Sequence, residues 1–408
     1  MKGADRAAAR LVRTAFAVRF VAAVLIHFLV PPGLLAPDEQ TYHARGSRLA
    51  QYWNGEIPRN PVSEMQGEGK AYFYIIAALY LPFGEVPLVP KVLNAWLGSL
   101  AVLELFRLTR LIGGSDTAAL RAARFMAFFP SMILWSSLMI RDVWVQWLLL
   151  RLARELAELK GRFIPMKIVS ALVWIWGLTM FRSYLLYAAV GPFILSFLLG
   201  RSKDLIRNLA LGSAMALALV YFGSQSASTS GDKVQTFDLV ELQRLRQWSS
   251  SAVAADSGFA TDADISTVGG ALSLLPIGLV YFFFAPFPWQ LGSIRQSLAI
   301  PETLYFYTLV PGIIAGILFL FRQRLVDSLG VLLVAMTVTF GYAIGQGNVG
   351  TLYRHKAQVT GFYYAFAAIG MEQRRKRTAA QYPGQMIQPS WRLPPDPGAS
   401  RPGRPLLP

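Results

Sequence analysis

The chain has no cysteine and only three histidines, His27, His43 and His355. The lack of cysteine excludes disulfides, thiolate chemistry and cysteine-based metal sites. Each histidine stands alone, without a histidine or cysteine partner at metal-ligand spacing. The sequence therefore predicts no metal site, and we also expect no redox cofactor.

Charged residues are scarce as well. Asp, Glu, Lys and Arg make up only 15% of the 408 residues, whereas 54% are hydrophobic. This balance is too apolar for a soluble protein of this size. We therefore predict a multi-pass membrane protein.

Acidic residues are fewer than basic ones, 23 against 39, which leaves a net charge of +16. Such a charge can indicate nucleic-acid binding, but here Lys and Arg occur in short clusters between apolar segments. That arrangement is typical of cytoplasmic loops in membrane proteins. We expect contact with membrane lipid and none with nucleic acid.

The apolar segments predict an all-α membrane helix bundle. A spanning helix needs about 20 largely apolar residues, and ten segments are near that length: 11–31, 88–112, 122–140, 142–160, 166–181, 183–200, 205–223, 301–321, 325–345 and 357–371. Two more runs, 71–83 and 271–287, are short or broken by proline, so the total lies between ten and twelve.

Loop charge favours ten spans. If 71–83 and 271–287 both stay on the outer side as re-entrant or interfacial helices, the basic loops all become cytoplasmic, including the one at 107–124. Both termini are then cytoplasmic as well. Broken helices at membrane depth are tolerated where they line a cavity, so this topology also predicts an outward-facing cavity.

The same topology divides the chain into two parts. Residues 1–378 form a membrane domain with two large outer loops, 32–87 and 224–300, and residues 379–408 form a disordered cytoplasmic tail. The basic start followed by residues 14–31 resembles a signal sequence, but no small-x-small cleavage motif precedes Asp38. We interpret this segment as a retained anchor.

Two adjacent acids, Asp38 and Glu39, follow the first predicted span. Ionisable groups at a membrane boundary are costly, so a cluster of them indicates a functional site. The predicted topology places further charged groups at the same face: His43, Lys70, Arg141, Asp142, Arg182, Arg354, His355 and Lys356. Acids and bases from several loops suit a substrate whose phosphate lies at the lipid surface, with a carboxylate as proton acceptor.

Structural roles are open for the same residues. Asp38 is also a suitable N-cap for the helix that begins at QTYHARG. Arg141 and Asp142 can form a local ion pair that closes a turn between two helices. Arg182, between two apolar runs, can simply extend to the membrane surface.

Several motifs resemble the integral-membrane glycosyltransferases of the GT-C type, in particular the family 39-like, protein-mannosyltransferase-related bacterial proteins. They are PDE at 37–39, the segment KAYFYIIAALYLPFGEVPLVPKVLNAWLGSL at 70–100, FFPSMILWSSLMIRD at 128–142 and GTLYRHK at 350–356. The chain differs from the usual pattern in having Ala71 and Tyr72 where a proline pair is common. The likeness covers about the first 160 residues well and the end more loosely.

The resemblance implies a GT-C-like fold and an inverting glycosyltransferase in the bacterial cytoplasmic membrane. Its donor would be a polyprenyl-phosphate-linked sugar, and its acceptor a glycan or protein hydroxyl in surface polysaccharide or glycoconjugate assembly. Asp38 would be the catalytic base and Glu39 its neighbour in the acidic motif. Arg354 and Lys356 would hold the departing phosphate.

Two other functions fit the same features. A polysaccharide polymerase, as for O-antigen, also joins lipid-linked glycans outside the cell and uses loop arginines, but it needs no carboxylate base as early as Asp38. A lipid-linked glycan transporter would instead place charges through the core toward both membrane faces. The one-sided charge cluster favours chemistry over transport.

Overall fold

The computed structural model describes residues 2–64, 70–159, 164–198, 239–251, 258–289 and 294–381. These ranges contain fourteen α-helices and the short 3₁₀ helix η1 (Pro61–Glu64). The helices are α1 (Lys2–Leu29), α2 (Asp38–Trp53), α3 (Lys70–Phe83), α4 (Leu88–Leu111), α5 (Asp116–Phe128), α6 (Pro130–Ser136), α7 (Asp142–Leu159), α8 (Pro165–Phe181), α9 (Leu185–Leu198), α11 (Leu239–Ser251), α12 (Val268–Phe284), α13 (Ile294–Gln323), α14 (Leu325–Gly345) and α15 (Val349–Gln381).

Four of these helices are long and apolar enough to cross a membrane: Gly3–Leu29 within α1, α4, Ala299–Gln323 within α13, and α14. Shorter apolar helices accompany them, among them α3, α8 and α12. At 1.5 Å per residue, the 14 residues of α3 reach only about 21 Å, less than the hydrocarbon core of roughly 30 Å. The all-α class is therefore confirmed, whereas the count of ten spans and their orientation stay predictions. The predicted span 205–223 and the tail from residue 382 lie outside the described residues.

The prediction of one continuous helix over 122–140 is wrong. The chain breaks between α5 and α6, where Phe129 is extended (φ −65°, ψ 131°). Pro130 explains the break, because a proline disfavours helical backbone in the residue before it and has no N–H to donate. The carbonyls of Met126 and Ala127 at the end of α5 instead accept hydrogen bonds from the buried Arg19 of α1, at 2.7 and 2.8 Å.

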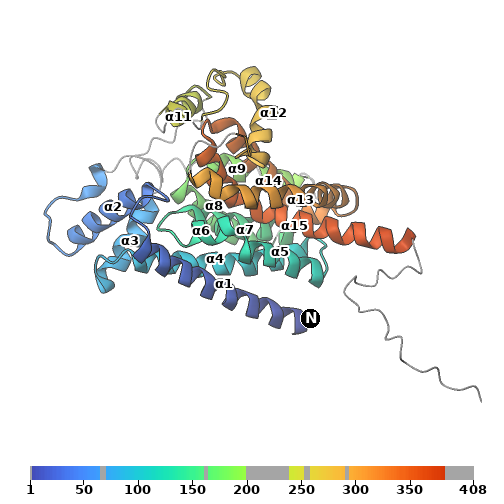
Figure 1. Cartoon of the computed structure of the whole chain (residues 1–408), viewed down its shortest axis with the longest axis horizontal. Coiled ribbons are helices and arrows are strands. Elements are labelled where there is room, and N and C mark those ends of the chain that lie inside the picture. Colours follow the sequence, from blue (N-terminus) through green and yellow to red (C-terminus); the bar gives the residue numbers. More distant parts are fainter. Residues whose placement is uncertain are drawn as a thin grey trace, which may run out of the picture.

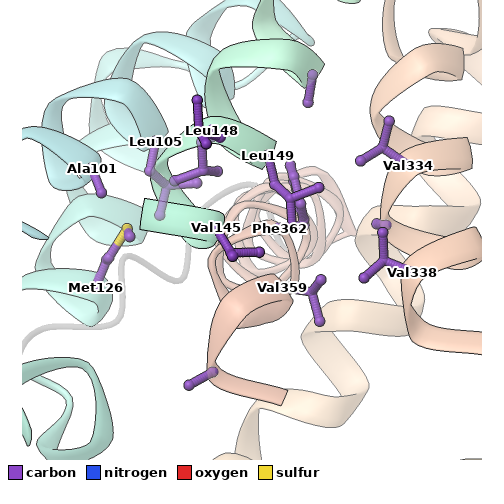
Figure 2. Packing of buried hydrophobic residues seen from close by; sticks show 14 of the residues in the cluster. Ala101, Leu105, Met126, Val145, Leu148, Leu149, Val334, Val338, Val359 and Phe362 are labelled. Atoms are coloured by element: carbon purple, nitrogen blue, oxygen red, sulfur yellow. The ribbon is translucent and has the colours of Figure 1, made fainter. Parts of the chain in front are cut away.

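The helix α15 runs through the centre of the bundle. All its side chains from His355 to Gly370 are buried, as expected for a helix surrounded by others. Figure 2 shows its residues Val359 and Phe362 between α7 and α14, with the labelled residues of α4 and α5 at the left of the view. The labelled neighbours there are Ala101, Leu105, Met126, Val145, Leu148, Leu149, Val334 and Val338.

The helices α13 and α15 lie parallel and approach each other closely. A Cβ added to Gly316 would lie 1.9 Å from the Phe366 carbonyl oxygen, and one added to Gly370 would lie 2.0 Å from that of Gly312. Only glycine allows this backbone contact, which is a common way of packing helices in membranes. Beyond the contact, α15 extends past the rest of the bundle (Figure 1).

Candidate functional site

Arg354, in the second turn of α15, connects two carboxylates from distant parts of the chain. Its Nη1 donates to Asp38 Oδ2 at 2.7 Å. Its Nε and Nη2 lie 2.7 and 2.5 Å from Asp142 Oδ2, at the start of α7. Charge-assisted bonds of this kind are among the strongest hydrogen bonds in proteins and fix the direction of the guanidinium.

The second carboxylate, Asp142, is the buried end of this cluster. Its Oδ1 lies 3.3 Å from Arg182 Nη2 and also accepts a hydrogen bond from the Gln358 amide. Gln358 follows Arg354 by four residues on α15, so both side chains face α7. Arg182 follows α8 directly and donates to the Tyr184 hydroxyl at 2.6 Å. Two acids and two arginines from four segments therefore meet at one end of the bundle.

The two acids of the cluster differ in their access to solvent. The Asp38 side chain is 51% exposed, whereas that of Asp142 is 2% exposed. A buried carboxylate between two arginines acts mainly as a fixed counter-charge. Asp38 alone of the two can meet a substrate and exchange its proton with it.

Asp38 does not cap a helix, so the alternative prediction of an N-cap is wrong. The helix α2 begins at Asp38 itself, its N-cap position is Pro37, and no side chain caps it. Asp38 is in the first helical turn, where a negative charge is still favoured by the helix dipole.

Glu39 points away from Asp38 and into the protein. Its Oε1 accepts a hydrogen bond from the Met139 N–H at 2.7 Å and lies 3.2 Å from the Lys91 ammonium on α4. The amide of Asn94, one turn further along α4, donates to the carbonyls of Leu138 and Ile140 at 2.7 and 2.8 Å. Glu39 and Asn94 thus hold the irregular segment that leads into α7 and so fix the position of Asp142.

The remaining predicted residues lie around the cluster rather than in it. His43 shares a hydrogen bond of 2.9 Å with the Tyr80 hydroxyl, and Arg141 donates to the Phe181 carbonyl at 2.8 Å. His355 is buried and stacks on Tyr342, with ring centroids 4.7 Å apart. Lys70 is buried at the first residue of α3.

Lys356 is separated from Arg354 although only one residue lies between them. Its ammonium donates to the Phe283 carbonyl at 2.7 Å and lies 4.0 Å from the centre of the Phe306 ring. It also lines a small pocket with Glu302 and Tyr353. Residues two apart on a helix face different directions, so one ligand atom cannot contact both bases in this arrangement.

Three further polar residues contribute to this region although they are not among the site residues predicted from the sequence: Lys91, Asn94 and Gln358. All three are buried in otherwise apolar helical stretches. Polar groups inside such helices are costly and seldom occur without a partner. A polar residue within an apolar stretch therefore indicates a buried polar contact at each of these positions, but the sequence does not show which residue is its partner.

Chemically, the cluster offers one accessible carboxylate and two guanidinium groups. The carboxylate can accept a proton, and the guanidinium groups can stabilise a phosphate. Within the described part of the chain, no three His, Asp or Glu side chains come together as a metal site requires.

No family model and no curated protein matches the chain. Solved structures with a similar fold include two of archaeal oligosaccharyltransferases. The crystal structure of the oligosaccharyltransferase of Archaeoglobus fulgidus in the apo form has a TM-score of 0.52 at 14% identity and covers 91% of this chain. The structure of the oligosaccharyltransferase AglB from the same organism, in complex with an inhibitory peptide and a dolichol-phosphate, has a TM-score of 0.53 at 13% identity and the same coverage.

The chain spans about half the length of these structures, 52% and 51%. At this identity the likeness shows the fold alone. The chain therefore has a helical fold similar to that of these oligosaccharyltransferase structures.

Proposed function

We propose that the chain is an inverting glycosyltransferase of the GT-C type. Its donor is a polyprenyl-phosphate-linked sugar, and its acceptor is a glycan or protein hydroxyl at the outer face of the bacterial cytoplasmic membrane. The observation that carries this proposal is the half-exposed carboxylate of Asp38, held by Arg354 on a GT-C-like scaffold. The complex of AglB with a dolichol-phosphate supports a lipid phosphate as the ligand class.

The reaction needs one base and one stabiliser of the leaving group. Asp38 accepts the proton of the acceptor hydroxyl, whose oxygen attacks C1 of the sugar from the face opposite the phosphate. The bond from the acceptor oxygen to C1 forms as the bond from C1 to the phosphate oxygen breaks. The electron pair of the broken bond leaves with the polyprenyl phosphate, which gains one negative charge.

Arg354 is placed to stabilise that charge. In the ligand-free arrangement, Asp38, Asp142, Arg354 and Arg182 together carry no net charge. When Asp38 takes up the acceptor proton, one positive charge of the cluster is no longer balanced, just as the phosphate becomes more negative. Asp142 keeps the guanidinium of Arg354 in place through this step because it bonds to a different pair of nitrogens.

The direct test is release of polyprenyl phosphate by the purified chain in lipid vesicles. Donors that differ in the sugar are offered with a hydroxyl acceptor, and the anomeric configuration of the product is determined by NMR. We expect an inverted product with the wild type and a turnover lower by about a hundredfold or more with Asp38→Asn. A retained configuration, or full turnover by Asp38→Asn, would contradict the mechanism.

A polysaccharide polymerase is the second candidate. The observation in its favour is that two arginines, Arg182 after α8 and Arg354 in α15, share one carboxylate at the site. Such an enzyme would extend a lipid-linked glycan and would accept a diphosphate-linked donor. Comparing monophosphate-linked and diphosphate-linked donors in the same vesicle assay separates the two functions.

A further inference from the structure

A second feature lies at the opposite end of α13 and α15, outside the candidate site. The two helices border a groove of about 400 Å³. Its walls are apolar along α13, with Ile314 and Leu318, and basic at the end, with Arg322 of α13 and Arg374 and Arg377 of α15. On α15 the lining begins at Gln373, three residues beyond Gly370, and on α13 it runs alongside the close contact from Pro311 to Gln323.

The groove lies about one membrane thickness from the candidate site. Twenty residues separate Arg354 from Arg374 on one continuous helix, a distance of about 30 Å at 1.5 Å per residue. The hydrocarbon core of a bilayer is also about 30 Å thick. The basic end of the groove therefore lies at the other membrane face and cannot take part in the proposed transfer reaction.

The arginines of the groove have no acidic partner within the described residues. The acid on the same turn of α15, Glu372, is engaged by Lys376 at 2.6 Å and by the backbone N–H of Ser115 at 3.3 Å. Polar lining comes from Gln323 and Gln373, whose amides can donate hydrogen bonds. The groove therefore presents positive charge and hydrogen-bond donors without a carboxylate.

We propose that this groove binds the headgroup of an anionic phospholipid from the cytoplasmic leaflet. The phosphate would lie among Arg322, Arg374 and Arg377, and an acyl chain would lie along Ile314 and Leu318 of α13. Both of these apolar side chains are about half exposed, at 54% and 46%, as expected for residues that face lipid. Basic pockets between helices at the cytoplasmic face recognise anionic headgroups by charge and geometry. A free phosphate ion would use only the basic half of the groove.

The test uses the full chain, purified in detergent and freed of lipid. Native mass spectrometry measures binding of phosphatidylglycerol, of phosphatidylcholine with the same acyl chains, and of inorganic phosphate. The groove variant is Arg374→Gln with Arg377→Gln. The control is Arg10→Gln with Arg375→Gln, which removes the same charge at exposed positions outside the groove. All four positions are exposed, so both variants should fold.

We expect phosphatidylglycerol to bind more tightly than phosphatidylcholine to the wild type and to the control. Each groove arginine should contribute about fivefold, so the groove variant should lose roughly thirtyfold in affinity for phosphatidylglycerol. Equal losses in the groove variant and the control would overturn the proposal. So would equal affinity for the two lipids, or inorganic phosphate binding as tightly as phosphatidylglycerol.

Discussion

The burial of Asp142 and the exposure of Asp38 predict losses of stability of very different size for the same substitution. Asp142→Ala leaves Arg354 and Arg182 near each other without the carboxylate between them, in a site where Asp142 is 2% exposed. Removing one partner of a buried ion pair typically costs 3–5 kcal/mol, so we expect a loss of about 4 kcal/mol in the free energy of unfolding. Asp38→Ala breaks a pair whose acid is 51% exposed, and we expect a loss of about 1 kcal/mol or less.

The assay is equilibrium unfolding in mixed micelles with increasing SDS, followed by tryptophan emission. A third variant, Asp142→Ala with Arg354→Met, also removes one of the two guanidinium groups that lose this carboxylate. Because residues in one ion-pair network couple, this double variant should be more stable than Asp142→Ala alone, by about 1–2 kcal/mol. Equal losses for Asp38→Ala and Asp142→Ala, or a double variant that loses the sum of both single effects, would refute the assignment of Asp142 as the buried counter-charge.

Other expected results follow from the same structure. Asp38→Asn should lower turnover by about a hundredfold or more with little change in stability, measured as polyprenyl phosphate released per folded protein; unchanged turnover would remove the base. Glu39→Gln leaves the Lys91 charge buried without its acid, so it should lower stability by roughly 3 kcal/mol, and adding Lys91→Met should recover part of that loss in the same unfolding assay. Gly316→Leu cannot fit against α15 and should prevent accumulation of folded protein, whereas Gly→Leu at an open position such as Gly191 should not. A label on Thr117→Cys, an exposed position in the first turn of α5, should be reached only from the cytoplasmic side.

Hydropathy was sufficient to predict most helices of the fold. The segments at 88–112, 166–181 and 325–345 correspond within one or two residues to α4, α8 and α14. Hydropathy did not predict the break within 122–140, because the mean hydropathy of a window changes little with a single proline, whereas the proline ends the helix locally. The signal for the break was Pro130 itself, together with Arg19, a mid-span charge that needs carbonyl partners.

The sequence indicated which charged residues face one side of the membrane, but not which of them pair. Asp142 and Arg354 are 212 positions apart, and Asp38 and Arg354 are 316 apart. The predicted topology places all of them at one face, whereas the positions of α2, α7, α8 and α15 in the fold select the pairs. Asp142 illustrates this point, since its carboxylate bonds to Arg354, Arg182 and Gln358, all of them distant in the sequence.

The two adjacent acids at 38 and 39 have different surroundings for a geometric reason. Successive residues of a helix point about 100° apart, so neighbours in the first turn of α2 cannot face the same partner. Asp38 faces Arg354 and is half exposed to solvent, whereas Glu39 faces α4 and the backbone that leads into α7. Because that backbone leads into Asp142, which in turn holds Arg354, Glu39 is connected to Asp38 through two side chains, Asp142 and Arg354. A change at Glu39 should therefore alter turnover through the position of Arg354, and Asp38→Asn should alter it without moving Arg354.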